Sequence, residues 1–330
     1  MSEPHGAQPP GDDPPLVIDV HGLTKSFDNT VVVDHVDMQV RKGEIYGFLG
    51  PNGSGKTTTI RMLCGLLTPD AGEGTCLGYD ILTQSEEIKL QVGYMTQHFS
   101  FYEDLSIREN LDFVASIFGL PNRSEKVEQT LEKLNLANRQ KQLAGTLSGG
   151  WKQRLALAAC VMHEPKLLLL DEPTAGVDPK ARRDFWDEIH GLAQDGLTVL
   201  VSTHYMDEAE RCHKICYLAY GHLLTKGTVH DVIENSGLYT WHVTGRTQRQ
   251  IIRLSHELSR RNGVEMVAPF GTTLHVSSSD ETALDRAVEP YRGEDGLNWK
   301  KDQPSLEDVF IHMMQGASDN FAGSAHEALP

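Results

Sequence analysis

Long hydrophobic runs are absent from this sequence of 330 residues. A helix that spans a membrane needs about 18 or more consecutive apolar residues, whereas the densest runs here, Leu167–Leu170 and Val199–Val201, have only the length of strands. The sequence begins MSEPHGAQPPGDDPP and so lacks the positive n-region and apolar h-region of a secretory signal. We therefore expect a chain that neither crosses a membrane nor is exported.

Cysteine and positive charge are also scarce. The five cysteines are an odd number scattered along the chain, which is not the pattern of a disulfide framework and favours a reducing cytoplasm. Lysine and arginine total 30 against 46 aspartates and glutamates, so the formal net charge is −16. Because a duplex-binding surface needs clustered cations, we expect no nucleic acid partner.

The first half of the chain has enough alternating apolar sequence to predict a folded α/β core. Residues 1–15 are rich in proline and predict a disordered tail. Short alternating runs over 16–49 predict strands with a hairpin at Asp28–Asn29, and the spacing over 57–67 predicts a helix. Several helical patterns without intervening strands predict a helical insertion over about 98–163.

In the second half, the runs LLLLD and LTVLVST enclose a helical pattern over 179–193, which predicts a βαβ unit and a parallel sheet. A hairpin is predicted about Tyr220–Gly221, and the composition changes near residue 236. Beyond that point we predict a strand, a helix over 248–261, a hairpin and a second helix over 282–291. The expected organisation is a tail over 1–15, a main domain over 16–235, a small α+β domain over 236–315 and a flexible tail over 316–330.

The sharpest motif is GPNGSGKT at 50–57, which matches G-x-x-x-x-G-K-[ST] where a predicted strand gives way to a predicted helix. Its glycines let the backbone curl so that its N–H groups and the helix N-terminus surround phosphate oxygens. In this pattern Lys56 reaches the β and γ phosphates, and the Thr57 hydroxyl ligates Mg²⁺. An ordinary glycine-rich turn is the alternative, which the strand-loop-helix context disfavours.

Two further motifs indicate parts of a nucleotide site when they occur together with this loop. The apolar strand Leu167–Leu170 ends in Asp171 and Glu172, which predicts a carboxylate beside Mg²⁺ and another that polarises water. By itself, a strand that runs into a charged turn would explain the pair equally well. The segment LSGGW at 147–151 begins a predicted helix with Ser148 as N-cap and can bind an anion. A plain helix cap remains the alternative reading of that segment.

The order of GPNGSGKT, Gln97, LSGGW, LLLLDEP, the segment at 175–178 and His204 resembles the nucleotide-binding subunit of an ATP-binding cassette (ABC) transporter. The resemblance covers about residues 16–235, and the position of LSGGW between the other two motifs makes it specific. It implies a P-loop NTPase core with a parallel sheet, an N-terminal antiparallel β subdomain and the helical insertion. It also implies hydrolysis of ATP with Mg²⁺ in a head-to-tail dimer.

Carried over residue by residue, the resemblance implies a catalytic role for several side chains. Lys56, Thr57 and Asp171 hold the phosphates and Mg²⁺, while Gln97 contacts the metal and senses a membrane partner. Glu172 is the implied general base. Because every residue that the family needs for hydrolysis is present, a site that binds ATP without hydrolysing it is disfavoured.

The resemblance also implies residues that bind the nucleotide. His204, which the resemblance also makes a catalytic residue, contacts the γ-phosphate, Asp178 links the two sites of the dimer, and Ser148 and Gly150 cap the ATP of the partner copy. Phe27, in the loop after the first predicted strand, matches the aromatic residue that stacks on adenine, with a core or hairpin aromatic as the alternative. The complete implied nucleotide-binding set is Phe27, Gly50, Pro51, Asn52, Gly53, Ser54, Gly55, Lys56, Thr57, Thr58, Ser148, Gly149, Gly150 and Asp178.

Two residues depart from the family pattern. Trp151 stands where the signature usually has Gln, and we expect it to modulate dimerisation without abolishing nucleotide binding. Phe27 stands where Tyr is more frequent, and its aromatic face is preserved.

A single P-loop in a chain without spanning helices implies partners. These are a second copy or a homologous ATPase subunit, together with integral membrane permease subunits. The chain itself is then expected in the cytoplasm, peripheral on the cytoplasmic face of the cell membrane. The run PSLEDVFI at 304–311 and the small domain are similar to the ATPase subunits of bacterial ABC-2 type exporters, which implies a drug, lipid or polysaccharide-like cargo. Phe99, Phe101, Tyr102 and Leu105 predict the membrane contact, with a packed loop as the alternative.

Two other functions stay open on the sequence alone. A cassette ATPase that drives a membrane-associated machine without transport would share every catalytic residue. A regulatory module that binds ATP without turnover belongs to a different functional class.

Overall fold

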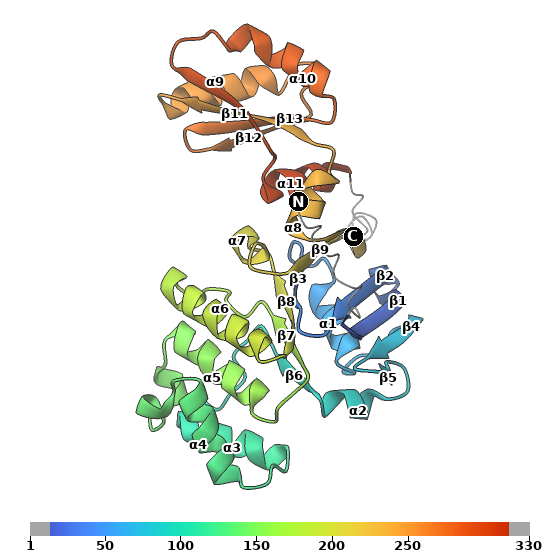
Figure 1. Ribbon diagram of the computed structural model, residues 1–330, viewed down its shortest axis with the longest axis vertical. Coiled ribbons are helices and arrows are strands. Elements are labelled where there is room, and N and C mark those ends of the chain that lie inside the picture. Colours follow the sequence, from blue (N-terminus) through green and yellow to red (C-terminus); the bar gives the residue numbers. More distant parts are fainter. Residues whose placement is uncertain (1–13, 317–330) are drawn as a thin grey trace, which may run out of the picture. The chain divides into compact units, whose positions relative to one another are not determined.

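The computed structural model describes residues 14–316 (Figure 1). Its internal contacts divide them into two compact units. The first unit contains residues 14–46 and 56–202, and the second contains residues 47–55 and 203–316. The predicted tails lie outside the described residues except for Pro14, Pro15 and Gly316, and the predicted boundary near residue 236 stays a prediction. Across the described ranges, no helix combines the length and the apolar character needed to cross a bilayer.

An antiparallel sheet opens the first unit, with strand order β2-β1-β4-β5. Its predicted hairpin is confirmed, because Asp28 and Asn29 both adopt positive φ and so form the two-residue turn that matches strand twist. The other two strands were not predicted, since the glycines of β4 are typical of a turn. Here they permit close approach, because a Cβ on Gly74 would lie 2.2 Å from the carbonyl oxygen of Asp19. The strands are β1 (Leu16–Phe27), β2 (Thr30–Arg41), β4 (Ala71–Cys76) and β5 (Tyr79–Asp80).

A parallel ladder of three strands forms the centre of the same unit, in the order β6-β7-β8. This confirms the predicted βαβ unit, in which α6 connects β7 to β8. Both β7 and β8 are buried along their whole length, as expected for a parallel sheet covered on both faces. These elements are β6 (Val92–Met95), β7 (Leu167–Asp171), α6 (Pro179–Gln194) and β8 (Thr198–Thr203).

The helices of the first unit begin with α1 (Lys56–Leu63), which is shorter than the predicted helix over 57–67. Gly65 ends it by adopting a φ of +72°, and the N–H groups of Leu66 and Leu67 then bond to the carbonyl of Arg61. The predicted helical insertion is confirmed between β6 and β7 (Figure 1). Its helices, with the short one that precedes β6, are α2 (Ser85–Lys89), α3 (Ile107–Ile117), α4 (Arg123–Lys133) and α5 (Gly149–Val161).

The second unit contains the end of β3 (Ile45–Leu49), the loop that follows it, and the chain from residue 203 onward. Its β9–β10 hairpin turns at Tyr220 and Gly221, as predicted. A separate antiparallel sheet has the order β12-β13-β11-β14. The elements are α7 (Met206–Ala209), β9 (Lys214–Ala219), β10 (His222–Gly227), α8 (Val229–Glu234), β11 (Tyr239–Gly245), α9 (Gln248–Leu258), β12 (Met266–Phe270), β13 (Thr273–Ser278), α10 (Glu281–Val288), β14 (Leu297–Asp302) and α11 (Leu306–Gly316).

The two helices predicted for this part of the chain are shorter than expected, and both pack on one face of the separate sheet (Figure 1). The predicted helix over 248–261 ends at Leu258, and the one over 282–291 ends as α10 at Val288, followed by a 3₁₀ turn. Alternation along β11 and β13 points Trp241, Val243, Leu274 and Val276 toward α9 and α10, where they form a common core.

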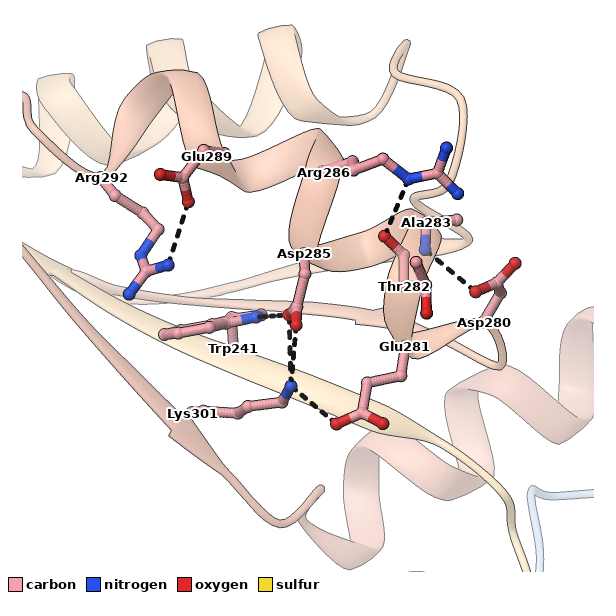
Figure 2. Close-up of polar contacts among 10 residues, drawn as sticks. All are labelled: Trp241, Asp280, Glu281, Thr282, Ala283, Asp285, Arg286, Glu289, Arg292 and Lys301. Carbon is pink, nitrogen blue, oxygen red and sulfur yellow. Dashed lines mark hydrogen bonds and ion pairs between the residues drawn. The ribbon is translucent and has the colours of Figure 1, made fainter.

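A polar network fixes α10 to this sheet (Figure 2). The indole N–H of Trp241 donates to Asp285 at 2.7 Å, and Lys301 contacts the same carboxylate at 3.1 Å and that of Glu281 at 2.7 Å. Asp280 caps the helix by accepting a hydrogen bond from the N–H of Ala283. The Trp241 hydrogen bond is the main reason that the pKa of Asp285 lies below its ordinary value.

Replacement of Asp285 by alanine should lower the free energy of unfolding by about 1–2 kcal/mol, because the buried Trp241 N–H loses its acceptor. Since the folded pKa of Asp285 is lowered, this contribution is full above the unfolded pKa and disappears as the pH falls through the folded one. Urea unfolding followed by tryptophan fluorescence at pH 7 measures the loss. Glu289→Gln, which alters an exposed ion pair with Arg292, is the control and should change stability by less than about 0.5 kcal/mol. Equal effects of the two variants would contradict the assignment.

Candidate active site

The loop after β3 is shaped by three glycines. Gly50, Gly53 and Gly55 have φ values of 150°, 79° and 103°, which L residues with a side chain rarely adopt. The carbonyl of Pro51 accepts a hydrogen bond from the N–H of Ser54, which closes the turn. The exposed residues Asn52 and Gly53 lie at its tip, and Ser54 and Gly55 are buried. The loop therefore has the curled form that the motif predicts.

The hairpin of β9 and β10 supports this loop from behind. A Cβ on Gly50 would lie 2.0 Å from the carbonyl oxygen of Leu218, so no larger residue fits there. The N–H of Gly221 donates to the carbonyl of Ser54 at 3.2 Å. The Ser54 hydroxyl is itself buried and has no hydrogen-bond partner. An unpaired buried hydroxyl in a loop of this shape fits a missing acceptor such as a phosphate oxygen.

Lys56 follows Gly55 directly and is the first residue of α1. Its side chain is 4% exposed, and its Nζ lies 3.6 Å from Oε1 of Glu172. Burial lowers the pKa of Lys56, although Glu172 and Asp171 act in the opposite direction. The next two residues, Thr57 and Thr58, are half-buried. The helix thus begins with a buried cation beside two carboxylates.

The two acidic residues lie at the carboxyl end of β7, as predicted. Asp171 is 2% exposed and accepts a hydrogen bond from the Ser202 hydroxyl at 2.7 Å. The N–H of Glu172 donates to the carbonyl and the hydroxyl of the same serine. Glu172 has a φ of 47°, a strained value for a residue with a long side chain, and this turn directs it away from the strand.

Gln97 joins this group from the segment after β6. Its amide Nε2 donates to Oε2 of Glu172 at 3.0 Å, while Lys56 contacts the other carboxylate oxygen. The structure therefore brings together four of the predicted residues: Lys56, Gln97, Asp171 and Glu172. His204 is in the second unit, directly after β8, and its ring lies 4.1 Å from that of Tyr205.

The signature segment, Leu147–Trp151, leads into α5 and forms part of a different pocket. Ser148 is the N-cap of α5, but its side chain accepts no capping hydrogen bond. A Cβ on Gly150 would lie 2.5 Å from Cβ of Ala181, so α5 and α6 approach closely there. The neighbouring Asp178 caps α6 by accepting from the N–H groups of Lys180 and Ala181. The pocket has a volume of about 260 Å³ and is lined by Ser148, Gly150, Trp151, Arg154, Asp178, Lys180, Ala181, Asp184 and Phe185.

Trp151, the departure from the family pattern, lies between two cations. The guanidinium carbons of Arg139 and Arg154 are 4.6 and 5.2 Å from the centre of its indole ring. These contacts hold the ring at the edge of the signature pocket. This arrangement was not predicted, because Arg139 is 12 residues upstream on a separate 3₁₀ turn.

Phe27 is the last residue of β1, whereas the sequence placed it in the loop after the first strand. The turn consists of Asp28 and Asn29 alone, so Phe27 still pairs with Thr30 in the hairpin. Its side chain is 45% exposed, with the Lys25 ammonium 5.7 Å from the ring centre. The ring is therefore outside the core but is an aromatic of the hairpin, and its stacking on adenine stays a prediction.

The oxygen donors near Lys56 fit Mg²⁺ by their chemistry. Thr57, Gln97 and Asp171 offer a hydroxyl, an amide oxygen and a carboxylate, which are hard ligands of the kind this ion prefers.

Ser202 was not predicted as a site residue, although it fixes both Asp171 and Glu172 by hydrogen bonds. A serine inside the apolar run TVLVST, which is parallel to the acidic strand, was an available signal. A larger pocket of about 680 Å³ lies beside α4 and contains none of the predicted site residues, so pocket size alone does not identify the site.

Comparison with known proteins gives this site a family. Residues 33–175 match the family model described as ABC transporter. The Nod factor export ATP-binding protein I of Rhizobium sp. (strain N33) is 36% identical over 302 residues, which are 90% of this chain and 97% of that protein. The probable multidrug ABC transporter ATP-binding protein YbhF of Escherichia coli (strain K12) is 45% identical over 218 residues, or 66% of this chain, and the match spans 38% of that protein's length.

A solved structure, the dimeric post-hydrolysis state of the ATP-binding cassette MJ0796 bound to ADP and Pi, superposes with a TM-score of 0.58. The match covers 64% of this chain and 98% of that one at 24% identity, and this likeness shows the fold.

The curled glycine loop, the buried lysine and the acidic end of β7 define a P-loop ATPase. Within that class, the chain belongs to the ATP-binding subunits of ABC transporters, as the family model and the Nod factor export relatives show. The predicted fold and family are thereby confirmed.

Proposed function

We propose that this chain hydrolyses ATP within a head-to-tail dimer and thereby energises an ABC-2 type exporter. The observation that carries the proposal is the division of the predicted residues into two separate groups. Lys56 and Gln97 both contact Glu172, which follows Asp171 at the end of β7, whereas Ser148 and Gly150 line a pocket with Asp178. Two half-sites on one chain are what a dimer needs if each ATP lies between unlike surfaces of two copies.

Glu172 is the best placed general base for the hydrolysis of ATP. It is 9% exposed, its carboxylate is held by Lys56 and Gln97, and its N–H is fixed by Ser202. A base held from three sides can orient a water molecule toward a phosphorus atom without loss of side-chain freedom during the reaction. Lys56 can then transfer its contact from Glu172 to the phosphates, which leaves the carboxylate available to the water.

Thr57 and Asp171 are the residues that would hold Mg²⁺, with Gln97 as a third donor. When bound, the ion neutralises the charge that develops on the phosphate oxygens. The chain's own residues keep Asp171 ready for that role, because the Ser202 hydroxyl donates to one carboxylate oxygen and leaves the other for a ligand. The glycine loop and Lys56 would contact the phosphates, Phe27 the adenine and His204 the γ-phosphate.

Export is supported by the names of the relatives and by coverage of the small C-terminal domain. The Nod factor export protein matches 90% of this chain, so the similarity extends beyond the ATPase region to the residues around 236–315. The cargo class that this supports is drug, lipid or polysaccharide-like. Its passage would be through permease subunits of the cell membrane, with this chain on their cytoplasmic face.

An exposed aromatic surface near Gln97 is the proposed contact with those permease subunits. Phe99 and Phe101 have ring centres 5.4 Å apart, and Tyr102 packs edge-on against Phe113 at 5.2 Å. Tyr102 and Phe113 are 53% and 41% exposed, whereas Phe99, Phe101 and Leu105 are half-buried, so a packed loop stays the alternative for these three. Gln97, beside these rings, contacts Glu172. A permease helix that docks on the rings can therefore influence the catalytic carboxylate through Gln97.

Replacement of Phe101 and Tyr102 by glutamate should abolish co-purification with the permease and its stimulation of ATP turnover, while basal turnover stays within about twofold. The reason is that the new charges would have to be desolvated against an apolar docking helix. Affinity purification from detergent-solubilised membranes, with turnover assays on the same fractions, measures both quantities. Exposed Leu90→Glu is the control. Co-purification and stimulation that persist in the double variant would overturn the docking surface.

The identity of the permease tests the wider proposal. A co-purified integral subunit with six spanning helices and an ABC-2 pattern supports export. A partner with an importer-type coupling loop would overturn the direction of transport, and a partner that forms no pore would favour a machine without transport.

A further inference from the structure

The C-terminal sheet has a second face that its fold does not explain. Its first face carries the apolar core under α9 and α10. On the opposite face the register pairs His242 of β11 with His275 of β13, and Thr240 with Ser277 beside them. Asp308 of α11 reaches this face and is fully buried. A polar face covered by a helix contributes little hydrophobic stabilisation, so the polar residues buried there need another explanation.

The three side chains offer donor atoms that converge. Nδ1 of His275 lies 2.8 and 3.1 Å from the two carboxylate oxygens of Asp308. The rings of His242 and His275 are stacked with centres 3.9 Å apart and an interplanar angle of 11°. One donor atom from each residue lies within 4.8 Å of the others. Two ligands bonded at about 2.0–2.2 Å to one tetrahedral ion are about 3.3–3.6 Å apart, so the hydrogen-bonded His275–Asp308 pair has to open by about 0.5 Å to hold an ion. Because a metal–nitrogen bond lies in the plane of the imidazole ring, one of the two stacked rings also has to rotate for both to bind the same ion.

Neighbouring groups fix Asp308 but leave one ring nitrogen of His242 without a hydrogen-bond partner. The N–H and hydroxyl of Ser305 both donate to Oδ2 of Asp308, which fixes the carboxylate toward His275. In contrast, Nε2 of His242 is buried and makes no hydrogen bond. A buried ring nitrogen without a partner is costly unless something else satisfies it.

We propose that His242, His275 and Asp308 bind a divalent transition metal ion, with Zn²⁺ as the expected occupant. Two imidazoles and one carboxylate suit Zn²⁺ and its neighbours in the first transition row, whereas Mg²⁺ and Ca²⁺ prefer oxygen ligands alone. Three protein ligands leave one position of a tetrahedron for water. This ion is separate from the Mg²⁺ of ATP hydrolysis, and the inference does not rest on the proposed transport function.

Such an ion would connect α11 to the C-terminal sheet. The same helix contacts the β9–β10 hairpin, because the ring of Phe310 stacks on that of Tyr217 with centres 4.0 Å apart. The helix therefore holds two parts of the second unit, one through Phe310 and the other through Asp308. Metal binding would strengthen the second attachment and stabilise the C-terminal domain.

The test uses the full chain, freed of any affinity tag and treated with a chelator, titrated with ZnCl₂ in a calorimeter. We expect one Zn²⁺ per chain, a rise in the melting temperature on addition of Zn²⁺, and at least about tenfold weaker binding for His242→Ala. Because His242 Nε2 has no hydrogen bond to lose, this variant should fold as the wild type does. His256→Ala, an exposed histidine on α9 of the same domain, is the matched control and should bind as the wild type does.

Asp308→Asn tests the third proposed ligand in the same way. Asp308 also accepts a hydrogen bond from the Ser305 hydroxyl. Circular dichroism first establishes that each variant is folded. Absence of stoichiometric Zn²⁺ binding by the wild type, or binding and thermal stabilisation that His242→Ala leaves unchanged, would overturn the proposal.

Discussion

Glu172→Gln should lower the turnover number for ATP hydrolysis by about 10²–10⁴-fold, which is the range that a general base contributes. Glutamine keeps the size of the side chain and can still contact Gln97 and Lys56, but it cannot accept a proton from water at neutral pH. Binding of ATP should survive, since none of the glycine-loop contacts change. The prediction is therefore a protein that binds ATP and retains it unhydrolysed.

Steady-state phosphate release and equilibrium binding of ATP measure these two quantities on the same preparation. Size-exclusion chromatography with light scattering should show a dimer of the Glu172→Gln chain when ATP is present and a monomer without it. Glu86→Gln is the control, because Glu86 is exposed and pairs with Lys89 on the surface of α2. Turnover by the Glu172→Gln chain near the wild-type rate would exclude Glu172 as the base. Absence of turnover in the wild type would favour the regulatory module.

Lys56→Met should weaken ATP binding by about 10- to 100-fold, and turnover should fall with it. A hydrogen bond between a charged group and phosphate contributes about 1.5–3 kcal/mol, which corresponds to that range. Methionine retains the length of the side chain within a site that is 4% exposed, so the effect reports the lost charge more than lost packing. Removal of Lys56 also leaves the buried Glu172 with one cation fewer.

Equilibrium binding of a fluorescent ATP analogue, with competition by ATP, measures this loss. Lys89→Met is the matched control, because it removes the other half of the exposed Glu86 pair and should leave the affinity unchanged. An affinity within twofold of the wild type would show that Lys56 does not contact the phosphates.

Much of the fold could be predicted because local signals and tertiary packing agree. The hairpin at Asp28–Asn29, the buried strand Leu167–Leu170 and the hairpin at Tyr220–Gly221 all combine a turn signal with a clear period. Two predictions failed at glycines. Gly74 lies inside β4 and not in a turn, because β1 passes directly against it. Gly65 adopts a positive φ and ends α1 earlier than the apolar spacing predicts.

The candidate site was predictable in identity but not in arrangement. The motifs gave Lys56, Asp171 and Glu172, and a family resemblance added Gln97, whose contact with Glu172 the structure shows. Support from Ser202 was not predicted, because it depends on the register of two parallel strands. The three residues of the proposed metal site lie on β11, β13 and α11, and their separation in sequence conceals their meeting. Roles of single residues in catalysis stay predictions.

In the proposed dimer, each ATP lies between the P-loop of one copy and the signature segment of the other. A mixture of two inactive chains, one with Lys56→Met and the other with Ser148→Arg, tests this arrangement. A mixed dimer contains one site in which both halves are intact. If chains exchange freely, half of the dimers are mixed, and the account predicts recovery of ATP turnover to about one quarter of the wild-type rate. Turnover that does not exceed that of the separate variants would contradict it.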